Sequence, residues 1–230
     1  GAVGEATASV RWSTIARDFI ASKPLVAKPN QQAAFRVFAY LSLAQYRAVA
    51  AAHETRGHPP HPSASRAASA ASAVLLGALF PADAGFFDSQ LIAQESDITE
   101  PPGQVGAFGA GEVVGRSIGA QVAELARTDG FDAVWTGTAP TGPGLWSSDF
   151  DPPRPPLLPL LGRMRPFFLT SGDQFRPGPP PAFGTPAYLA ALAEIRHFSD
   201  TRTADQLRIA EFWAMPTVAA FWNEQATTLI

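Results

Sequence analysis

The chain has 230 residues, of which 46% are hydrophobic and 16% are charged, a balance that is typical of a globular protein and excludes disorder of the whole chain. Its formal net charge of -3 and the lack of any basic run argue against nucleic acid as the main partner. Cysteine is absent, which excludes disulfides, cysteine nucleophiles, iron–sulfur clusters and thiolate zinc sites.

The first part of the chain predicts two helices. Residues 1 to 8 are small and polar, and we expect them to form a loose arm. Apolar residues at three- and four-residue steps then predict an amphipathic helix over about 9–22. A second, central helix is predicted from Asn30, a suitable N-cap residue, to about His53.

Prolines and capping residues delimit the next two helices. The run 57–62 must interrupt the chain, because proline lacks a backbone donor and cannot continue a helix. Either Ser63 or Ser65 can cap a third helix that runs to about Phe80. Asp83 can cap a fourth helix. The buried side of that fourth helix is expected to carry Phe86, Phe87, Leu91 and Ile92.

A fifth helix is predicted from about Gln104 to Arg127, with Gly130 as its terminator. Three glycines four residues apart fall on one face of this helix, where the missing side chains let another backbone approach closely. Neither their spacing nor their context fits a phosphate-binding loop, so they indicate tight helix packing. These glycines are Gly111, Gly115 and Gly119.

Residues 135–184, called the strap below, are so rich in proline and glycine that neither a helix nor a central strand can form there. Large apolar residues such as Trp146 and Phe168 distinguish the strap from a polar linker, because they need burial. We therefore predict a long ordered loop packed across the helical body. Three more helices are predicted beyond it, over about 187–198, 204–213 and 217–230, the first capped by Thr185 and the second by Thr203.

No alternation of apolar and polar residues indicates a strand, so the predicted fold class is all-α, a helical bundle with a long ordered strap. The predicted divisions are an N-terminal helical body over 1–134, the strap over 135–184 and C-terminal helices over 185–230. Together they make one domain or the N-terminal half of a larger one.

Histidines and serines show none of the familiar catalytic spacings. His53, His58 and His61 lack a ligand pattern such as H-E-x-x-H, so no metal site is predicted. Ser63 and Ser171 lie outside any G-x-S-x-G element of a serine hydrolase, and both are expected to act as capping or turn residues.

Arginines of the strap are the main chemical clue, because a partly buried guanidinium requires an oxyanion or carbonyl partner. In one interpretation these arginines bind an anionic ligand. In the other they bind strap carbonyls and neighbouring carboxylates, which avoids an unpaired buried charge. The arginines are Arg154, Arg163, Arg165 and Arg176, and the neighbouring acids are Asp149, Asp151 and Asp173.

Three segments carry a resemblance to a known family. They read G-P-G-L-W at 142–146, G-R-M-R-P-F-F-L-T-S-G-D-Q-F-R-P-G-P-P-P at 162–181 and T-R-T-A-D-Q-L-R-I-A-E-F-W at 201–213. They resemble the N-terminal half of bacterial vanadium-dependent haloperoxidase-like proteins, in the superfamily of type 2 phosphatidic acid phosphatases. Helical segments at 39–52 and 73–81 are similar to earlier helices of that family, so the resemblance covers nearly the whole chain.

The resemblance implies an all-α, exported protein whose relatives hold vanadate or a phosphate ester. In that superfamily the oxyanion is bound by motifs of the form K-x6-R-P, P-S-G-H and S-R-x5-H-x3-D, and this sequence contains none of them. We therefore expect no catalytic residue, metal or cofactor in this chain, with vanadate bound only in a complete protein. The resemblance implies a wall of the substrate entrance, or an anion contact, at Arg165, Gln174 and Arg176.

The leading hypothesis is a scaffold portion of such a protein, with haloperoxidase or phosphatase activity only in the complete protein. The apolar helical pattern is still running at Ile230, which predicts a second polypeptide or a missing C-terminal half that carries the catalytic residues. The alternative is a non-catalytic structural or assembly subunit that kept the helical scaffold and binds a partner chain, in an oligomer.

Two further expectations concern location. No window of 18 uninterrupted apolar residues occurs, so no transmembrane segment is predicted. The chain starts at Gly1 rather than Met, which predicts a removed leader and a secreted, periplasmic or cell-surface protein.

Overall fold

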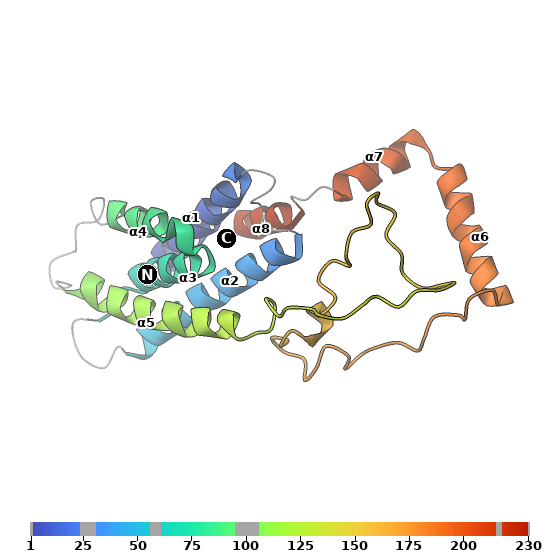
Figure 1. The fold of residues 1–230 in the computed structure, drawn as a ribbon. Coiled ribbons are helices and arrows are strands. Elements are labelled where there is room, and N and C mark those ends of the chain that lie inside the picture. The colour runs from blue at the N-terminus through green and yellow to red at the C-terminus, as the bar shows by residue number, and fades with distance from the viewer. Residues whose placement is uncertain (1, 24–30, 56–60, 95–105, 215–217, 230) are drawn as a thin grey trace. The chain divides into compact units, whose positions relative to one another are not determined.

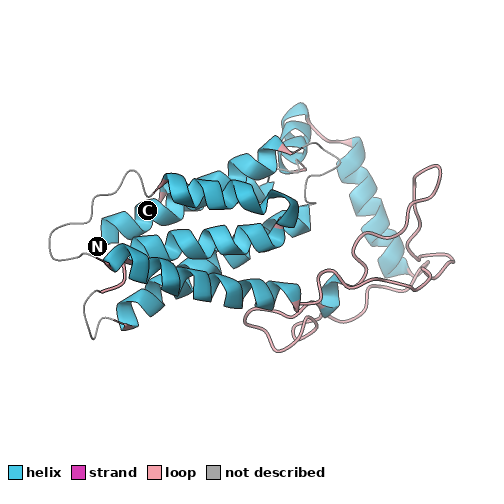
Figure 2. Ribbon diagram, turned by 60° about the vertical axis from the view of Figure 1, so that its left-hand side comes forward, coloured by secondary structure: helices cyan, strands magenta, loops and turns pink. Residues whose placement is uncertain are grey.

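The computed structural model describes residues 2–23, 31–55, 61–94, 106–214 and 218–229, and these residues form helices and loops without any strand (Figure 1, Figure 2). The predicted all-α class is therefore confirmed. The α-helices are α1 (Ala2–Ser22), α2 (Gln31–Glu54), α3 (Ala64–Leu79), α4 (Ala84–Ala93), α5 (Ala107–Arg127), α6 (Pro186–Asp200), α7 (Ala204–Trp213) and α8 (Val218–Thr228). Two short 3-10 helices are η1 (Pro81–Asp83) and η2 (Leu161–Arg163).

The chain forms two compact units. Unit 1 comprises residues 1–126 and 214–230, and unit 2 comprises residues 127–213. This division differs from the predicted one, because α8 packs against α1 and α2 (Figure 1). Arg17 of α1 donates a hydrogen bond to Asn223 Oδ1 of α8 at 2.7 Å. Such a contact, between residues more than 200 positions apart, has no local signal in the sequence.

The most enclosed helix of unit 1 is α3, which contacts α1, α2 and α4. Of its 16 residues, 11 are buried, and most of the buried ones are alanine or serine. These small side chains let neighbouring helices approach α3 from several sides. The largest fully buried side chains of the described residues are Trp12, Leu41, Leu75, Leu76, Phe87, Leu91 and Val122.

The loose arm predicted for residues 1 to 8 is wrong for residues 2–8, which form the first turns of α1. Alanine and glutamate favour helix there, and the packing of the rest of α1 extends that preference toward the N-terminus.

The face predicted for the fourth helix is only partly buried. Phe87 and Leu91 are completely buried, whereas Phe86 is 41% exposed and Ile92 is 59% exposed. The Phe86 ring instead stacks on Phe19 of α1, with the two ring centroids 5.5 Å apart. Only two of the four apolar residues predicted for the buried face of this ten-residue helix are therefore buried.

Three helix starts match the predicted caps. Ser63 Oγ accepts a hydrogen bond from the Arg66 backbone N–H at 3.2 Å. Thr185 and Thr203 cap α6 and α7 in the same way. Asn30 lies outside the described residues, as do residues 56–60, 95–105 and 215–217. Gly130 follows α5 with a φ of 89°, a conformation that glycine adopts without strain.

The Asp83 cap predicted for the fourth helix is wrong as a hydrogen bond. Asp83 occupies the N-cap position of α4, but its side chain makes no capping hydrogen bond. Its carboxylate instead accepts from Lys23 Nζ at 2.6 Å. The ion pair with the end of α1 replaces the local cap.

Replacing Ser63 with alanine is expected to lower the free energy of unfolding of unit 1 by about 1 kcal/mol, because the first turn of α3 loses its side-chain cap. Ser65 lies one residue inside α3, so Ser65→Ala is the matched control and should be neutral or stabilising by up to about 0.5 kcal/mol. Urea denaturation followed by circular dichroism measures both variants. Equal losses for the two variants would contradict the assigned cap.

The strap contains no α-helix and no strand in the structure, and η2 is its only 3-10 turn. The strap lies in unit 2. Burial of its large side chains against the helical body is not confirmed, since Leu157 is 71%, Phe168 98% and Phe175 77% exposed. Composition alone shows that these side chains favour a covering surface, but not which surface covers them.

Helices α6 and α7 contain no buried residue. Large apolar side chains are exposed along both helices, namely Leu189, Leu192, Ile195 and Phe198 on α6, and Leu207, Ile209, Phe212 and Trp213 on α7. No helix in the described ranges combines the length and the apolar character that crossing a membrane requires.

Candidate functional site

The strap residues with the strongest family resemblance form two turns that lie against each other. The first turn is η2, and the second spans 170–176, where the Arg176 N–H donates to Asp173 O at 3.0 Å. A Cβ atom added to Gly172 would overlap the Gly162 carbonyl oxygen. Only glycine at position 172 permits this contact, whereas a Cβ added to Gly162 would meet no atom within 4 Å.

Gln174 holds the second turn closed. Its Oε1 accepts hydrogen bonds from the Thr170 backbone N–H at 2.8 Å and from Thr170 Oγ1 at 3.2 Å. The side-chain carbonyl of Gln174, one of the predicted site residues, therefore accepts its hydrogen bonds from within the same turn. Gln174 fixes the shape of the turn that carries Arg176.

Arg176 has a carboxylate partner nearby. The Ser171 hydroxyl and a backbone N–H donate to the Asp173 carboxylate, and together with the nearby Arg176 charge they hold the pKa of Asp173 below its ordinary value. This arrangement agrees with the interpretation in which strap arginines interact with neighbouring acids.

Arg165 fastens the strap to the segment that follows α5. Its backbone N–H donates to Asp129 O at 2.8 Å, and its Nη2 donates to Thr128 Oγ1 at 3.4 Å. Asp129 is 3% exposed, and its Oδ1 caps the Phe131 N–H at 2.8 Å. The structure thus gives Arg165, Gln174 and Arg176 local partners within unit 2.

Partial burial of the strap arginines, expected from their apolar neighbours, is wrong. The phenylalanines of the strap are themselves exposed, so they provide no enclosed surroundings for a guanidinium. The exposed arginines are Arg154, Arg163, Arg165 and Arg176.

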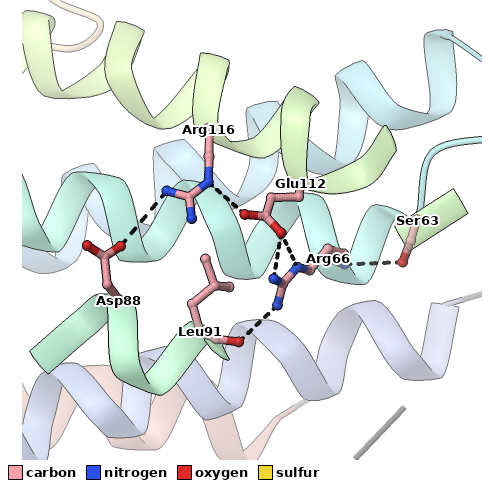
Figure 3. Close-up of polar contacts among 6 residues, drawn as sticks. All are labelled: Ser63, Arg66, Asp88, Leu91, Glu112 and Arg116. Atoms are coloured by element: carbon pink, nitrogen blue, oxygen red, sulfur yellow. Dashed lines mark hydrogen bonds and ion pairs between the residues drawn. The ribbon is translucent and has the colours of Figure 1, made fainter. Parts of the chain in front are cut away.

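A polar network around the buried Arg66 side chain joins α3, α4 and α5 (Figure 3). The Arg66 side chain is 1% exposed, and its Nη2 and Nε donate to Glu112 Oε2 at 2.6 and 3.2 Å. Its Nη1 donates to the Leu91 carbonyl at 3.0 Å. Arg116 Nε donates to the other Glu112 oxygen at 2.7 Å and reaches toward Asp88 at 3.9 Å (Figure 3).

The Arg66 guanidinium also lies 4.2 Å from the centroid of the Phe108 ring, which covers it on one side. Both carboxylate oxygens of Glu112 are occupied by arginine donors (Figure 3). Glu112 thus links α5 to α3 through Arg66, and Arg116 ties the same carboxylate to its own helix.

The glycine face of α5 brings this network together. A Cβ on Gly115 would lie 2.8 Å from Ala70 Cβ, and one on Gly119 would lie 2.8 Å from the Ala71 carbonyl oxygen. The predicted tight packing of these glycines is confirmed, and α3 is the partner helix.

The ionisation of Glu112 depends on the network. Burial alone would raise the pKa of Glu112, but hydrogen bonds and charges from Arg66 and Arg116 outweigh it and hold the pKa below its ordinary value. The folded-state pKa lies below the unfolded one, so the ionised carboxylate adds stability that is present above about pH 4.5. That contribution is lost as the pH falls through the folded-state pKa.

Glu112→Gln should therefore destabilise unit 1 relative to the wild type at pH 7, and the difference should shrink as the pH falls below about 4.5, the ordinary pKa of the carboxyl group. Urea denaturation of both proteins across this range measures the difference. Other carboxylates titrate in both proteins and cancel. A difference that stays constant down to about pH 3 would show that Glu112 does not carry this pH dependence.

Sequence reasoning missed Arg66 and Glu112. The available signal was that Arg66 is the only charged residue in the sixteen-residue helix α3, whose other residues are small or apolar. A charge on such a helix needs an opposite charge from a neighbour. Which acid supplies it depends on how α5 docks, and sequence spacing does not show that.

No three histidine, aspartate or glutamate side chains of the described residues gather closely enough to hold a metal ion. His58 lies outside those residues. Comparison of the chain with protein-family models, curated proteins and solved structures found no match.

Proposed function

We propose that this chain is the helical scaffold portion of a vanadium haloperoxidase-like or acid phosphatase-like protein of the exported type. The resemblance of residues 142–146, 162–181 and 201–213 supports it, together with the all-α fold of the described residues. The three oxyanion motifs are absent from the sequence, so the residues that hold the oxyanion belong to polypeptide outside these 230 residues.

The resemblance carries this proposal, and the exposed apolar surface of α6 and α7 supports the presence of additional polypeptide. Apolar surface is stabilised by about 25 cal/mol per Å² when it is removed from water, so two helices without any buried residue favour a covering partner. The region that resembles the family at 201–213 includes α7.

We infer that this portion supplies no vanadate ligand of its own. The enclosed guanidinium of Arg66 is already bound to Glu112, and Arg176 lies beside the Asp173 carboxylate. In the proposed protein the role of this portion is positional. Arg165, Gln174 and Arg176 would form a wall of the substrate entrance, held in place by the two strap turns.

Orthovanadate binding and turnover test the proposal. We expect the 230-residue chain alone to bind no orthovanadate and to show no bromide oxidation by hydrogen peroxide and no hydrolysis of 4-nitrophenyl phosphate. A protein that contains this chain together with all three motifs should bind orthovanadate and catalyse one of the two reactions. Activity of the chain alone, or inactivity of the protein with all three motifs, would contradict the proposal.

A second candidate is a non-catalytic assembly subunit that kept the helical scaffold. The same surface on α6 and α7 supports it, because a partner chain would cover that surface equally well. The two candidates differ in the partner: an assembly partner forms a stoichiometric complex that lacks the three motifs and both activities.

A further inference from the structure

The strap contains a surface pocket of about 580 Å³ within residues 146–157. Small-molecule sites usually have volumes of about 300–1,000 Å³, with mainly apolar walls and a few polar groups. This pocket has that composition: Trp146, Phe150 and Leu157 form apolar walls, while Asp149 and Arg154 add opposite charges.

The loop that forms the pocket is closed by one hydroxyl group. Ser148 Oγ accepts hydrogen bonds from the Phe150 N–H at 3.3 Å and from the Arg154 N–H at 2.9 Å. Both the aromatic wall and the arginine are therefore tied to the same serine. A loop held in this way loses less conformational entropy when a ligand binds.

Arg154 presents its guanidinium over an aromatic face. The guanidinium carbon lies 3.9 Å from the centroid of the Phe150 ring. Within the described part of the chain, no carboxylate forms an ion pair with Arg154. Stacking on the ring fixes the guanidinium plane and leaves its N–H edge available for a planar carboxylate, which arginine binds through two parallel hydrogen bonds.

The apolar walls are also uncovered. Trp146 is 52% exposed and Phe150 is 55% exposed, which is a large exposed area for two aromatic side chains within five residues. Asp149 lines the same pocket and disfavours a ligand with more than one negative charge. These features favour an aromatic ring that bears a single carboxylate.

We propose that this pocket binds small aromatic monocarboxylates, with the ring packed on Trp146 and Phe150 and the carboxylate on the Arg154 guanidinium. The site belongs to unit 2 alone. Binding can therefore be measured on the chain alone, without any turnover.

Titration of the chain with 3-phenylpropionate tests this site, with the indole N–H signals of the five tryptophans as the readout. Trp146→Phe assigns the Trp146 signal. We expect saturable shifts of that signal and a dissociation constant at least about tenfold higher for Arg154→Gln, because a charge-assisted hydrogen bond is lost. Arg163→Gln removes another exposed strap arginine outside the pocket, so it is the matched control and should bind like the wild type.

Two other ligands test the chemistry of the site. 3-Phenylpropan-1-ol keeps the ring without the charge, and benzylphosphonate carries a larger negative charge, so both should bind more weakly than 3-phenylpropionate. The proposal is overturned if the Trp146 signal does not shift at about 10 mM 3-phenylpropionate, a concentration that detects even millimolar affinity. It is also overturned if the alcohol binds equally well, or if Arg154→Gln and Arg163→Gln bind equally.

Discussion

Glu112→Ala is expected to destabilise unit 1 by about 3 kcal/mol, because it leaves the Arg66 guanidinium buried without its carboxylate. The Arg66 side chain is 1% exposed, so water cannot replace the lost partner without opening the contact between α3 and α5. Glu112 itself is 23% exposed, which places the effect at the lower end of the range for buried pairs. Hydrogen exchange of the α3 amides measures the loss, since these amides exchange when unit 1 opens.

A matched control comes from the exposed pair between Arg208 and Asp205, whose side chains are 78% and 77% exposed. Asp205→Ala breaks a similar ion pair at the surface and should cost about 0.5 kcal/mol or less. The double variant Arg66→Met, Glu112→Leu should recover much of the stability lost in Glu112→Ala, because no buried charge remains. Equal losses from Glu112→Ala and Asp205→Ala would contradict the structural role of the network.

Gly115→Ala is expected to destabilise unit 1 by about 2 kcal/mol, although alanine is the better helix former. The added Cβ would lie 2.8 Å from Ala70 Cβ and would overlap the Ala67 carbonyl oxygen, so α5 would have to move away from α3. Such a movement would also stretch the hydrogen bonds between Arg66 and Glu112. Urea denaturation followed by circular dichroism gives the difference in unfolding free energy.

Gly109→Ala is the control in the same helix. No atom lies within 4 Å of a Cβ added to Gly109, so only helix propensity changes and a gain of up to about 0.5 kcal/mol is expected. The opposite signs at Gly109 and Gly115 separate helix–helix packing from propensity. Stabilisation by both variants would mean that α5 does not pack closely on α3.

Much of the helical fold could be predicted from local signals. Ser63, Thr185 and Thr203 mark the helix starts at which the structure shows their hydroxyls as caps. Spacing showed that one face of α5 must contact another backbone, and the structure identifies α3 as that backbone. Long-range features had no such signal: Glu112 is 46 residues from Arg66, and α8 returns to α1 from the far end of the chain.

The strap shows a different limit of sequence reasoning. Its prolines and glycines correctly exclude α-helix and strand, because this property is local. Whether Phe168 or Phe175 is covered depends on a surface that the residues themselves do not specify. Arg165 and Arg176 could be proposed as site residues because the sequence around them resembles that of the family. The contacts of Arg165 with Thr128 and of Arg176 with Asp173 could not be derived from the sequence, for the same reason.

Denaturing intact-mass spectrometry with peptide sequencing, applied to the protein purified under native conditions from its source, tests the scaffold proposal most directly. We predict that the three oxyanion motifs will be found in polypeptide covalently continuous with this chain or in a stoichiometric second chain. The contradicting result is a single 24.3 kDa species that carries none of the motifs and binds no second chain.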